Sequence, residues 1–108
     1  MGTSYYGVGG IGIEFSEDVI EGFVNNGIFT RESFDEDCDE VFSNVLKMKY
    51  EMAGNYYTSD FRHYIFVEGD TLLEINENSQ KFIDTFNSFG VFQLTMKDLV
   101  VIVDYQIM

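Results

Sequence analysis

The sequence contains no proline and no tryptophan, and it has one cysteine and one histidine among its 108 residues. Because Cys38 is alone, the chain cannot form an internal disulfide, and a reducing compartment is its natural setting. With one Cys and one His, the chain also lacks the ligands of an ordinary zinc site. The first residues form neither a basic segment nor an apolar run, so we expect no signal peptide and a cytoplasmic location.

Basic residues are also scarce. Six Lys and Arg stand against nineteen Asp and Glu, which gives a formal net charge of −13. Residues 1–40 hold ten of the acidic residues and only Arg31 as a base, a net charge of −9. Such a field repels DNA, RNA and anionic membranes, so it argues against direct binding to any of them. The longest aliphatic run, Leu99–Val103, is too short to span a bilayer. The charge therefore favours a basic partner.

The remaining composition is that of a folded protein. Hydrophobic residues make up 45% of the chain and include eleven phenylalanines, which rules against a disordered acidic tail. A chain of this length has room for one core, so we expect one acidic domain over residues 1–108.

Hydrophobic periodicity predicts an α+β fold with a small, mostly antiparallel sheet and about three helices, in the order β-α-α-β-β-β-α-β. Gly69-Asp70 is interpreted as a two-residue hairpin loop between two short strands. The predicted strands cover residues 4–15, 47–52 (ending at 53–55), 62–68 and 71–75, with one long or two short strands over 91–107 broken near Lys97-Asp98. The predicted helices cover residues 17–26, 34–46 and 79–89.

The first two helices each have an apolar stripe and an acidic outer face. Ser16 is placed to cap the first helix, and Thr30 or Ser33 the second. The first stripe comprises Val19, Ile20, Phe23 and Val24, and the second comprises Phe34, Cys38, Val41, Phe42, Val45 and Leu46. Opposite these stripes lie Glu17, Asp18 and Glu21 on the first helix and Glu32, Glu36, Asp39 and Glu40 on the second, with Asp35 and Asp37 at the edge.

Other candidate sites fail on spacing or context. Gly7–Gly12 matches G-x-G-x-x-G, but no helix opens within it, so we interpret it as a bulged N-terminal strand. Asp35, Asp37 and Asp39 have the spacing that begins a calcium loop, without its Gly and Glu. Cys38 lies on an apolar stripe, where a thiolate is disfavoured, and we expect His63 at the surface or an edge. No carboxylate pair is singled out for hydrolysis, and we predict no catalytic residue, metal or cofactor.

The aromatic doublets Tyr5-Tyr6 and Tyr56-Tyr57 lie in segments expected to be extended. Successive side chains of a strand point to opposite faces, so one ring of each doublet should face away from the core. Exposed tyrosine is typical of interfaces and is also ordinary on sheet surfaces, and the sequence favours neither interpretation.

The favoured functional hypothesis is a non-enzymatic decoy for nucleic acid. Basic grooves built for closely spaced phosphates accept other dense arrays of oxyanions. In size and charge, though in no motif, the chain is similar to the small acidic proteins that phages use against restriction and CRISPR enzymes, which implies an inhibitor of a DNA- or RNA-binding protein acting in the host cytoplasm. The predicted partner-binding residues are Glu17, Asp18, Glu21, Glu32, Asp35, Glu36, Asp39 and Glu40.

The alternative hypothesis is a structural or regulatory protein–protein interaction module, including a homodimer, in which the acidic surface provides solubility alone. Geometry separates the two hypotheses. A decoy needs its carboxylates on one continuous face, whereas solvation tolerates scattered ones.

Overall fold

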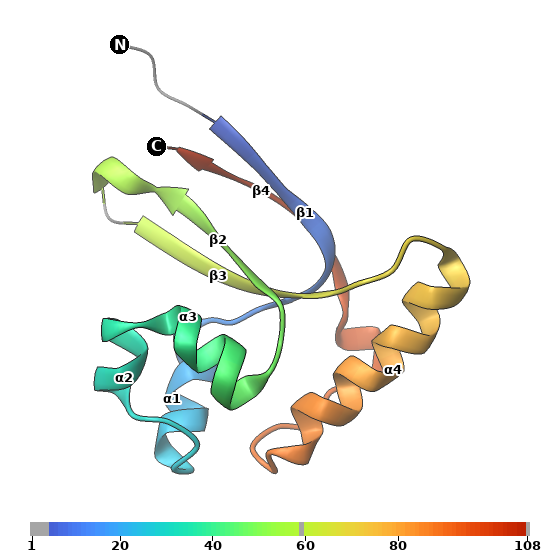
Figure 1. Ribbon diagram of the computed structural model, residues 1–108, viewed down its shortest axis with the longest axis horizontal. Helices are drawn as coiled ribbons and strands as arrows, with labels where there is room; N and C mark the ends of the chain where they lie inside the picture. The colour runs from blue at the N-terminus through green and yellow to red at the C-terminus, as the bar shows by residue number, and fades with distance from the viewer. Residues whose placement is uncertain (1–4, 59, 108) are drawn as a thin grey trace.

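The computed structural model describes residues 5–58 and 60–107 and is an α+β fold (Figure 1). Its four strands form one mixed sheet that carries helices toward one end. The strands are β1 (Tyr5–Glu14), β2 (Tyr50–Asn55), β3 (Asp60–Val67) and β4 (Val100–Ile107). The helices are α1 (Glu17–Asn25), α2 (Arg31–Glu36), α3 (Cys38–Glu40) and α4 (Leu72–Ser88), with a π-helical segment η1 (Val41–Leu46) and 3-10 turns η2 (Tyr56–Thr58) and η3 (Met96–Asp98).

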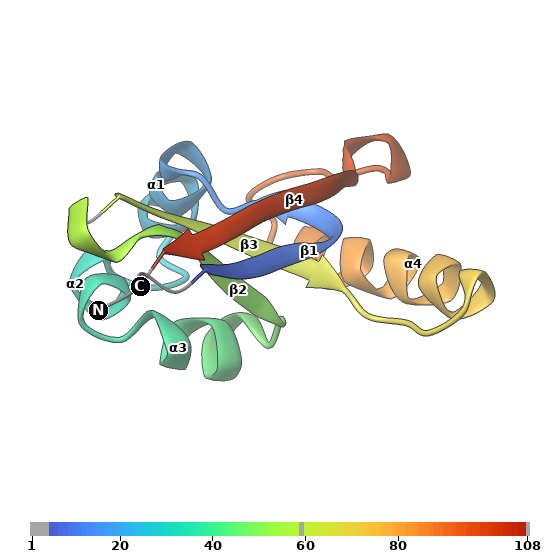
Figure 2. The same ribbon diagram turned by 90° about the horizontal axis from the view of Figure 1, so that it is seen from above.

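The sheet closes on itself in the order β1-β3-β2-β4, because β4 also pairs with β1. The pairings β1–β3, β1–β4 and β2–β3 are antiparallel, and β2–β4 is parallel. The result is two antiparallel ribbons, β1–β4 and β2–β3, which cross (Figure 2). Residues Ile11–Glu14 join them at one end and Gln106 with Ile107 at the other. The sheet is thus mixed, since two of its neighbours run parallel.

Glycine makes this tight closure possible at two positions. A Cβ at Gly12 would overlap the backbone carbonyl of Ile65, and one at Gly54 would overlap that of Asp60. Gly54 also has φ +131°, which side chains rarely allow. The ladder from Tyr5 opposite Ile107 to Gly12 opposite Val100 runs without interruption, so the predicted bulge in the N-terminal strand is wrong.

Two apolar clusters fill the fold. The smaller one lies inside the closed sheet and consists of Val8, Ala53, Phe66 and Ile102, with Tyr64 packed against it. The larger one lies between the sheet and the helices and is dominated by aromatic rings. Phe15 reaches from the end of β1 to Phe23 of α1 and Phe42 of η1, with ring centroids 5.5 and 5.1 Å apart. This larger cluster holds the helices against the sheet, and among these helices α1, α2 and α3 are rich in acidic residues.

The predicted helix over residues 34–46 is interrupted. It begins earlier, at Arg31, with Thr30 as its cap, and it breaks at Asp37, whose φ of −152° and ψ of 83° are not helical. A second helix begins there and widens into η1, so one helical wheel cannot describe the whole segment. Phe34, Val41, Phe42 and Leu46 are nevertheless buried, whereas Val45, expected in the core, is 38% exposed.

The predicted hairpin at Gly69-Asp70 is wrong. Residues 71–75 are the cap and first turn of α4, in which the Thr71 hydroxyl accepts the N–H of Glu74. The hairpin lies instead between β2 and β3, where Tyr57 belongs to a 3-10 turn rather than an extended segment, and its exposed side chain fits the expected outward ring. The side chains of Tyr5, Tyr6 and Tyr56 lie outside the described residues.

The C-terminal region is one strand. The break expected near Lys97-Asp98 coincides with η3, and the strand begins only at Val100. Thr95 and Asp98 form a reciprocal cap around η3, which ends the preceding coil before β4 starts.

Candidate functional site

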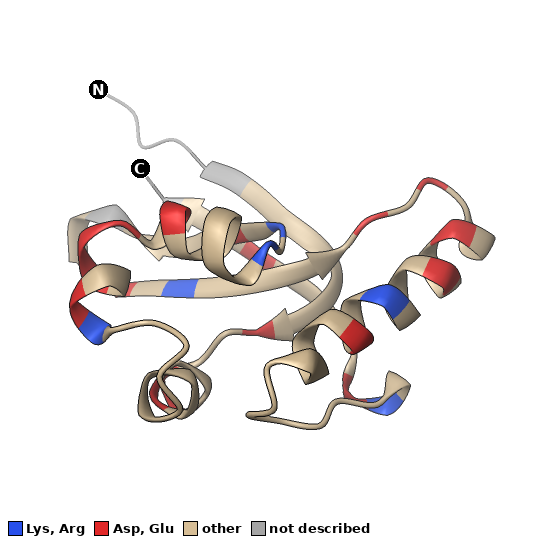
Figure 3. Cartoon of the chain, turned by 60° about the horizontal axis from the view of Figure 1, so that its bottom comes forward, with Lys and Arg blue, Asp and Glu red and all other residues tan. Residues whose placement is uncertain are grey.

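The helices α1, α2 and α3 form the most acidic part of the described chain. In Figure 3, acidic positions follow one another along α2 and the start of α3, whereas α4 carries both signs of charge. Ser16 stands at the N-cap of α1, as predicted, but its side chain makes no capping hydrogen bond. Thr30 caps α2 by accepting the N–H of Ser33 at 3.1 Å, and its hydroxyl also hydrogen-bonds the hydroxyl of Ser33 at 2.8 Å.

Arg31 ties the start of α1 to α2. Its guanidinium donates two hydrogen bonds, both 2.9 Å long, to the two carboxylate oxygens of Glu17, and its Nε lies 3.4 Å from Asp35. The hydrogen bonds from Arg31 lower the pKa of Glu17. All three side chains are solvent-exposed, so the pairs contribute orientation more than stability. Glu17 and Asp35 are therefore partly neutralised from within the chain.

Asp37 starts the second helical segment. Its carboxylate accepts the N–H of Glu40 at 3.2 Å, which satisfies a donor that the new helix end would otherwise leave free. The break turns α3 and η1 away from the axis of α2. Glu36 on one side and Glu40 on the other thereby come to line the same groove.

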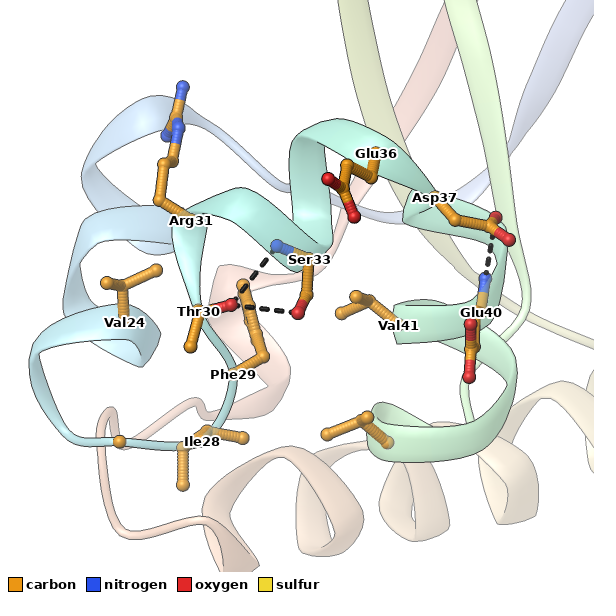
Figure 4. Close-up of a pocket in the computed structure, with 12 residues that line it drawn as sticks. Val24, Ile28, Phe29, Thr30, Arg31, Ser33, Glu36, Asp37, Glu40 and Val41 are labelled. Atoms are coloured by element: carbon orange, nitrogen blue, oxygen red, sulfur yellow. Dashed lines mark hydrogen bonds between the residues drawn. The ribbon is translucent and has the colours of Figure 1, made fainter.

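This groove has a volume of about 550 Å³ and lies between the α1–α2 loop, α2 and η1 (Figure 4). Its rim includes Arg31, Thr30 and Ser33 as well as three carboxylates, those of Glu36, Asp37 and Glu40. Apolar side chains from three elements line the rest: Val24, Ile28, Phe29, Val41 and Val45. An apolar surface beside carboxylates suits a cation on an aliphatic stem, as in lysine or arginine.

The structure brings together only part of the predicted acidic set. Glu36 and Glu40 line the groove, whereas Glu17 and Asp35 meet at Arg31. Within residues 5–58 and 60–107, six of the predicted residues form no ion pair and all are exposed: Asp18, Glu21, Glu32, Glu36, Asp39 and Glu40. Sequence reasoning left Asp37 out of the site, although Asp37 followed by Glu40 is a recognisable capping pattern.

Cys38 and His63 do not form a nucleophilic pair. The Cys38 sulfur lies 3.7 Å from the hydroxyl of Tyr50, and burial followed by the charge of Asp39 raises the pKa of the thiol. Cys38 is partly buried against the larger cluster, close to the predicted core position. His63, expected at the surface or an edge, is partly buried on β3. Its ring packs against Phe34 and Phe42, and burial lowers its pKa.

A polar cluster inside the closed sheet escaped the sequence analysis. Asp104 of β4 accepts hydrogen bonds from Arg62 at 2.8 and 3.1 Å and from the hydroxyl of Tyr64 at 2.6 Å. These bonds, those from Arg62 first, hold the pKa of Asp104 far below its usual range. Arg62 also pairs with Asp60 at 3.0 Å. The cluster has its hydrogen-bond partners within the fold, so we assign it to stability rather than chemistry.

The glycine-rich segment is strand throughout, and the next helix begins only at Glu17. It thus lacks the strand–turn–helix context of a dinucleotide site. In the described part of the chain, no group of three or more His, Cys, Asp or Glu is arranged to hold a metal ion. Helices long and apolar enough to cross a membrane are likewise absent from the residues that the structure describes.

Comparison with known proteins returned no matching family model, no matching curated protein and no matching solved structure.

Proposed function

We propose that the protein is a non-enzymatic acidic binding protein whose partner is basic, and that the groove between α2 and η1 is the centre of its interface. The observation that carries this proposal is the groove itself, where Glu36, Asp37 and Glu40 stand beside an apolar lining. A lysine or arginine of a partner would lay its stem on the apolar side chains and its charged head among the carboxylates.

The partner class follows from charge density. A protein with a net charge of −13 attracts basic surfaces over a distance of several ångströms, and nucleic-acid-binding proteins carry the densest such surfaces. We infer that the acidic residues of α1, α2 and α3 take the place of phosphates on such a protein and so inhibit it. The small acidic phage proteins directed against restriction and CRISPR enzymes, which this chain resembles in size and charge, suggest this role, and the proposal includes action in the host cytoplasm.

The test uses two variants with the same change in net charge. The first carries Glu36→Lys and Glu40→Lys at the groove. The second, the control, carries Asp70→Lys and Glu77→Lys, which are exposed and remote in sequence from the groove, and which form no ion pair among the described residues. Wild type and both variants serve as baits in a host lysate, and captured proteins are then measured individually.

The groove variant should weaken binding of a captured partner about tenfold to a hundredfold, mainly through a slower association, and the control should change it little. The partner should also release a labelled DNA or RNA duplex as wild-type protein is added. If both variants lost the same binding affinity, the loss would come from the change in net charge and not from the groove. A partner that keeps its nucleic acid, or that binds independently of salt, would contradict the decoy mechanism.

A second function has one observation in its favour. Strand β4 exposes a row of apolar side chains remote in sequence from the acidic helices, which is the kind of surface that an interaction module or homodimer would use.

A further inference from the structure

The outer face of the β1–β4 ribbon is apolar and carries no charge. On β4, Val101, Val103 and Tyr105 are 76%, 86% and 54% exposed, and they alternate with residues that turn inward. Their partners on β1 are Ile11, Gly9 and Gly7. Glycine leaves the outward valine and tyrosine standing above their neighbours, so the row is accessible from the side as well as from above.

The same strand has an open edge. On its second side, β4 pairs with β2 only at Gln106 and Ile107, so among the described residues its stretch from Val100 to Asp104 has no strand partner there. Unpaired strand edges of this kind readily accept another strand.

Hydrogen bonding shows which residues face that edge. The N–H of Phe15 donates to the carbonyl of His63 at 2.7 Å, so odd-numbered residues of β1 bond toward β3 and even-numbered ones toward β4. In the β1–β4 register, even-numbered residues of β1 lie opposite even-numbered residues of β4. The odd-numbered residues of β4 therefore direct their backbone groups away from β1. The N–H of Tyr105 agrees, since it donates to the carboxylate of Asp104 at 2.8 Å. Val101 and Val103 therefore direct their backbone groups to the open edge and their side chains to the outer face.

We propose that β4 pairs with β4 of a second copy of this chain, antiparallel about a two-fold axis at Ile102, to give a four-stranded ribbon β1–β4–β4–β1. In this register Val101 of each copy lies opposite Val103 of the other. Both residues direct their N–H and C=O to the open edge, so each such pair forms two hydrogen bonds. The valines also meet side by side on the outer face, a favourable cross-strand pair.

Charge identifies a second copy as the occupant. Two molecules that each carry −13 repel wherever their acidic surfaces approach. Ten of the nineteen acidic residues lie in residues 1–40, mostly on α1, α2 and α3. Asp104, the acidic residue of β4, points inward to Arg62 and Tyr64. A basic partner would gain nothing from this uncharged strip, whereas an acidic twin meets least repulsion there.

The size of the patch sets the expected affinity. Pairing through the strand edge leaves the outer face of β4 largely exposed and buries mainly the edge, so the interface lies below the roughly 1,000 Å² that specific complexes bury. With repulsion added, we expect a dimer of micromolar rather than nanomolar affinity. The repulsion between the two copies also predicts a salt dependence. Salt screens the repulsion, so the affinity of the dimer should rise with salt, whereas the affinity for a basic partner should fall.

Sedimentation equilibrium of the wild-type protein from about 5 µM to about 500 µM, at low and high salt, measures both features. We expect a monomer–dimer equilibrium that shifts toward dimer in high salt. Val103→Lys should weaken the dimer at least about tenfold, and Val101→Lys should do the same. Leu72→Lys on α4, a position 82% exposed, is the matched control and should leave the equilibrium unchanged. Unaltered thermal unfolding of each variant would show that the fold is intact.

A cross-link tests the register. In a Cys38→Ser background, Val101→Cys with Val103→Cys places two thiol pairs opposite each other across the two-fold axis, at the roughly 5.5 Å Cα separation that a disulfide accepts. Mild oxidation should give a covalent dimer, whereas Leu72→Cys in the same background should not.

A protein that stays monomeric at the highest concentration and salt would overturn the proposal. A dimer insensitive to Val101→Lys and Val103→Lys would do so too. Neither result bears on the acidic groove, because the Glu36 and Glu40 variants leave β4 unchanged and the β4 variants leave the groove unchanged.

Discussion

Replacing Asp104 by Asn should cost the fold about 2–3 kcal/mol at neutral pH. The carboxylate side chain is 13% exposed and accepts four hydrogen bonds, two from a guanidinium, one from a phenol and one from the backbone N–H of Tyr105. Asn keeps the shape but removes the charge that strengthens these bonds, each worth about 1.5–3 kcal/mol when charged. Arg62 is more exposed than Asp104, so water recovers part of the loss, and the total stays below the 3–5 kcal/mol of a fully buried pair.

Urea unfolding, followed by circular dichroism, measures this difference. The expected loss corresponds to a fall in melting temperature of about 9–13 °C for a chain of this length. The exposed Glu77→Gln is the control and should stay within about 0.5 kcal/mol of wild type.

The pH dependence follows from the depressed pKa of Asp104. A carboxyl group whose pKa is lowered by folding stabilises the native state above its unfolded pKa of about 3.9, and the contribution disappears as pH falls toward its folded pKa. The gap between wild type and Asp104→Asn should therefore be constant from neutral pH to about pH 5 and narrow below it. An equal gap at pH 7 and at about pH 2.5, or no gap at all, would refute the assignment of Asp104 as the charged centre of the cluster.

Two further predictions concern single positions. Gly12→Ala should destabilise by about 3 kcal/mol or more, because its Cβ would overlap the carbonyl of Ile65, whereas Gly7→Ala, which meets nothing within 4 Å, should stay within about 1 kcal/mol in the same denaturation assay. Cys38 should react with a thiol reagent more slowly in the native than in the unfolded protein, since burial raises its pKa and covers the sulfur, and Cys38→Ser should cost about 1–2 kcal/mol; rapid native labelling would place the sulfur at the surface.

Local signals in the sequence predicted the local structure well. The apolar spacing of Ile20 and Phe23 predicted the buried face of α1, and the helix predicted over residues 79–89 overlaps the second half of α4. Two local signals compete near Gly69-Asp70. The dipeptide lies between short apolar runs, as in a hairpin loop, whereas Thr71 and Glu74 have the spacing of a helix cap, and in the structure the cap prevails.

Closure of the sheet could not be predicted in this way. Arg62 and Asp104 lie 42 positions apart, and nothing in either local sequence indicates that they meet. The parallel pairing of β2 with β4 depends on the crossing of the two ribbons, which only the packed core determines. The groove of the candidate site could not be predicted either, because it depends on the break in the helix at Asp37. A single helical wheel, which assumes an unbroken helix, placed Val45 in the core.

The ladder between β1 and β4 has a consequence for how the chain reaches its fold. It joins Tyr5 to Ile107 and Gly12 to Val100, contacts of nearly the greatest sequence separation that the chain allows. Proteins dominated by such distant pairings fold slowly, on the scale of milliseconds to seconds, because loop closure precedes any reward from the contacts. During synthesis β1 emerges well before β4, its main partner. The glycines of β1 lower its tendency to aggregate as an isolated strand. This property suits a segment that stays unpaired until β4 has been synthesised.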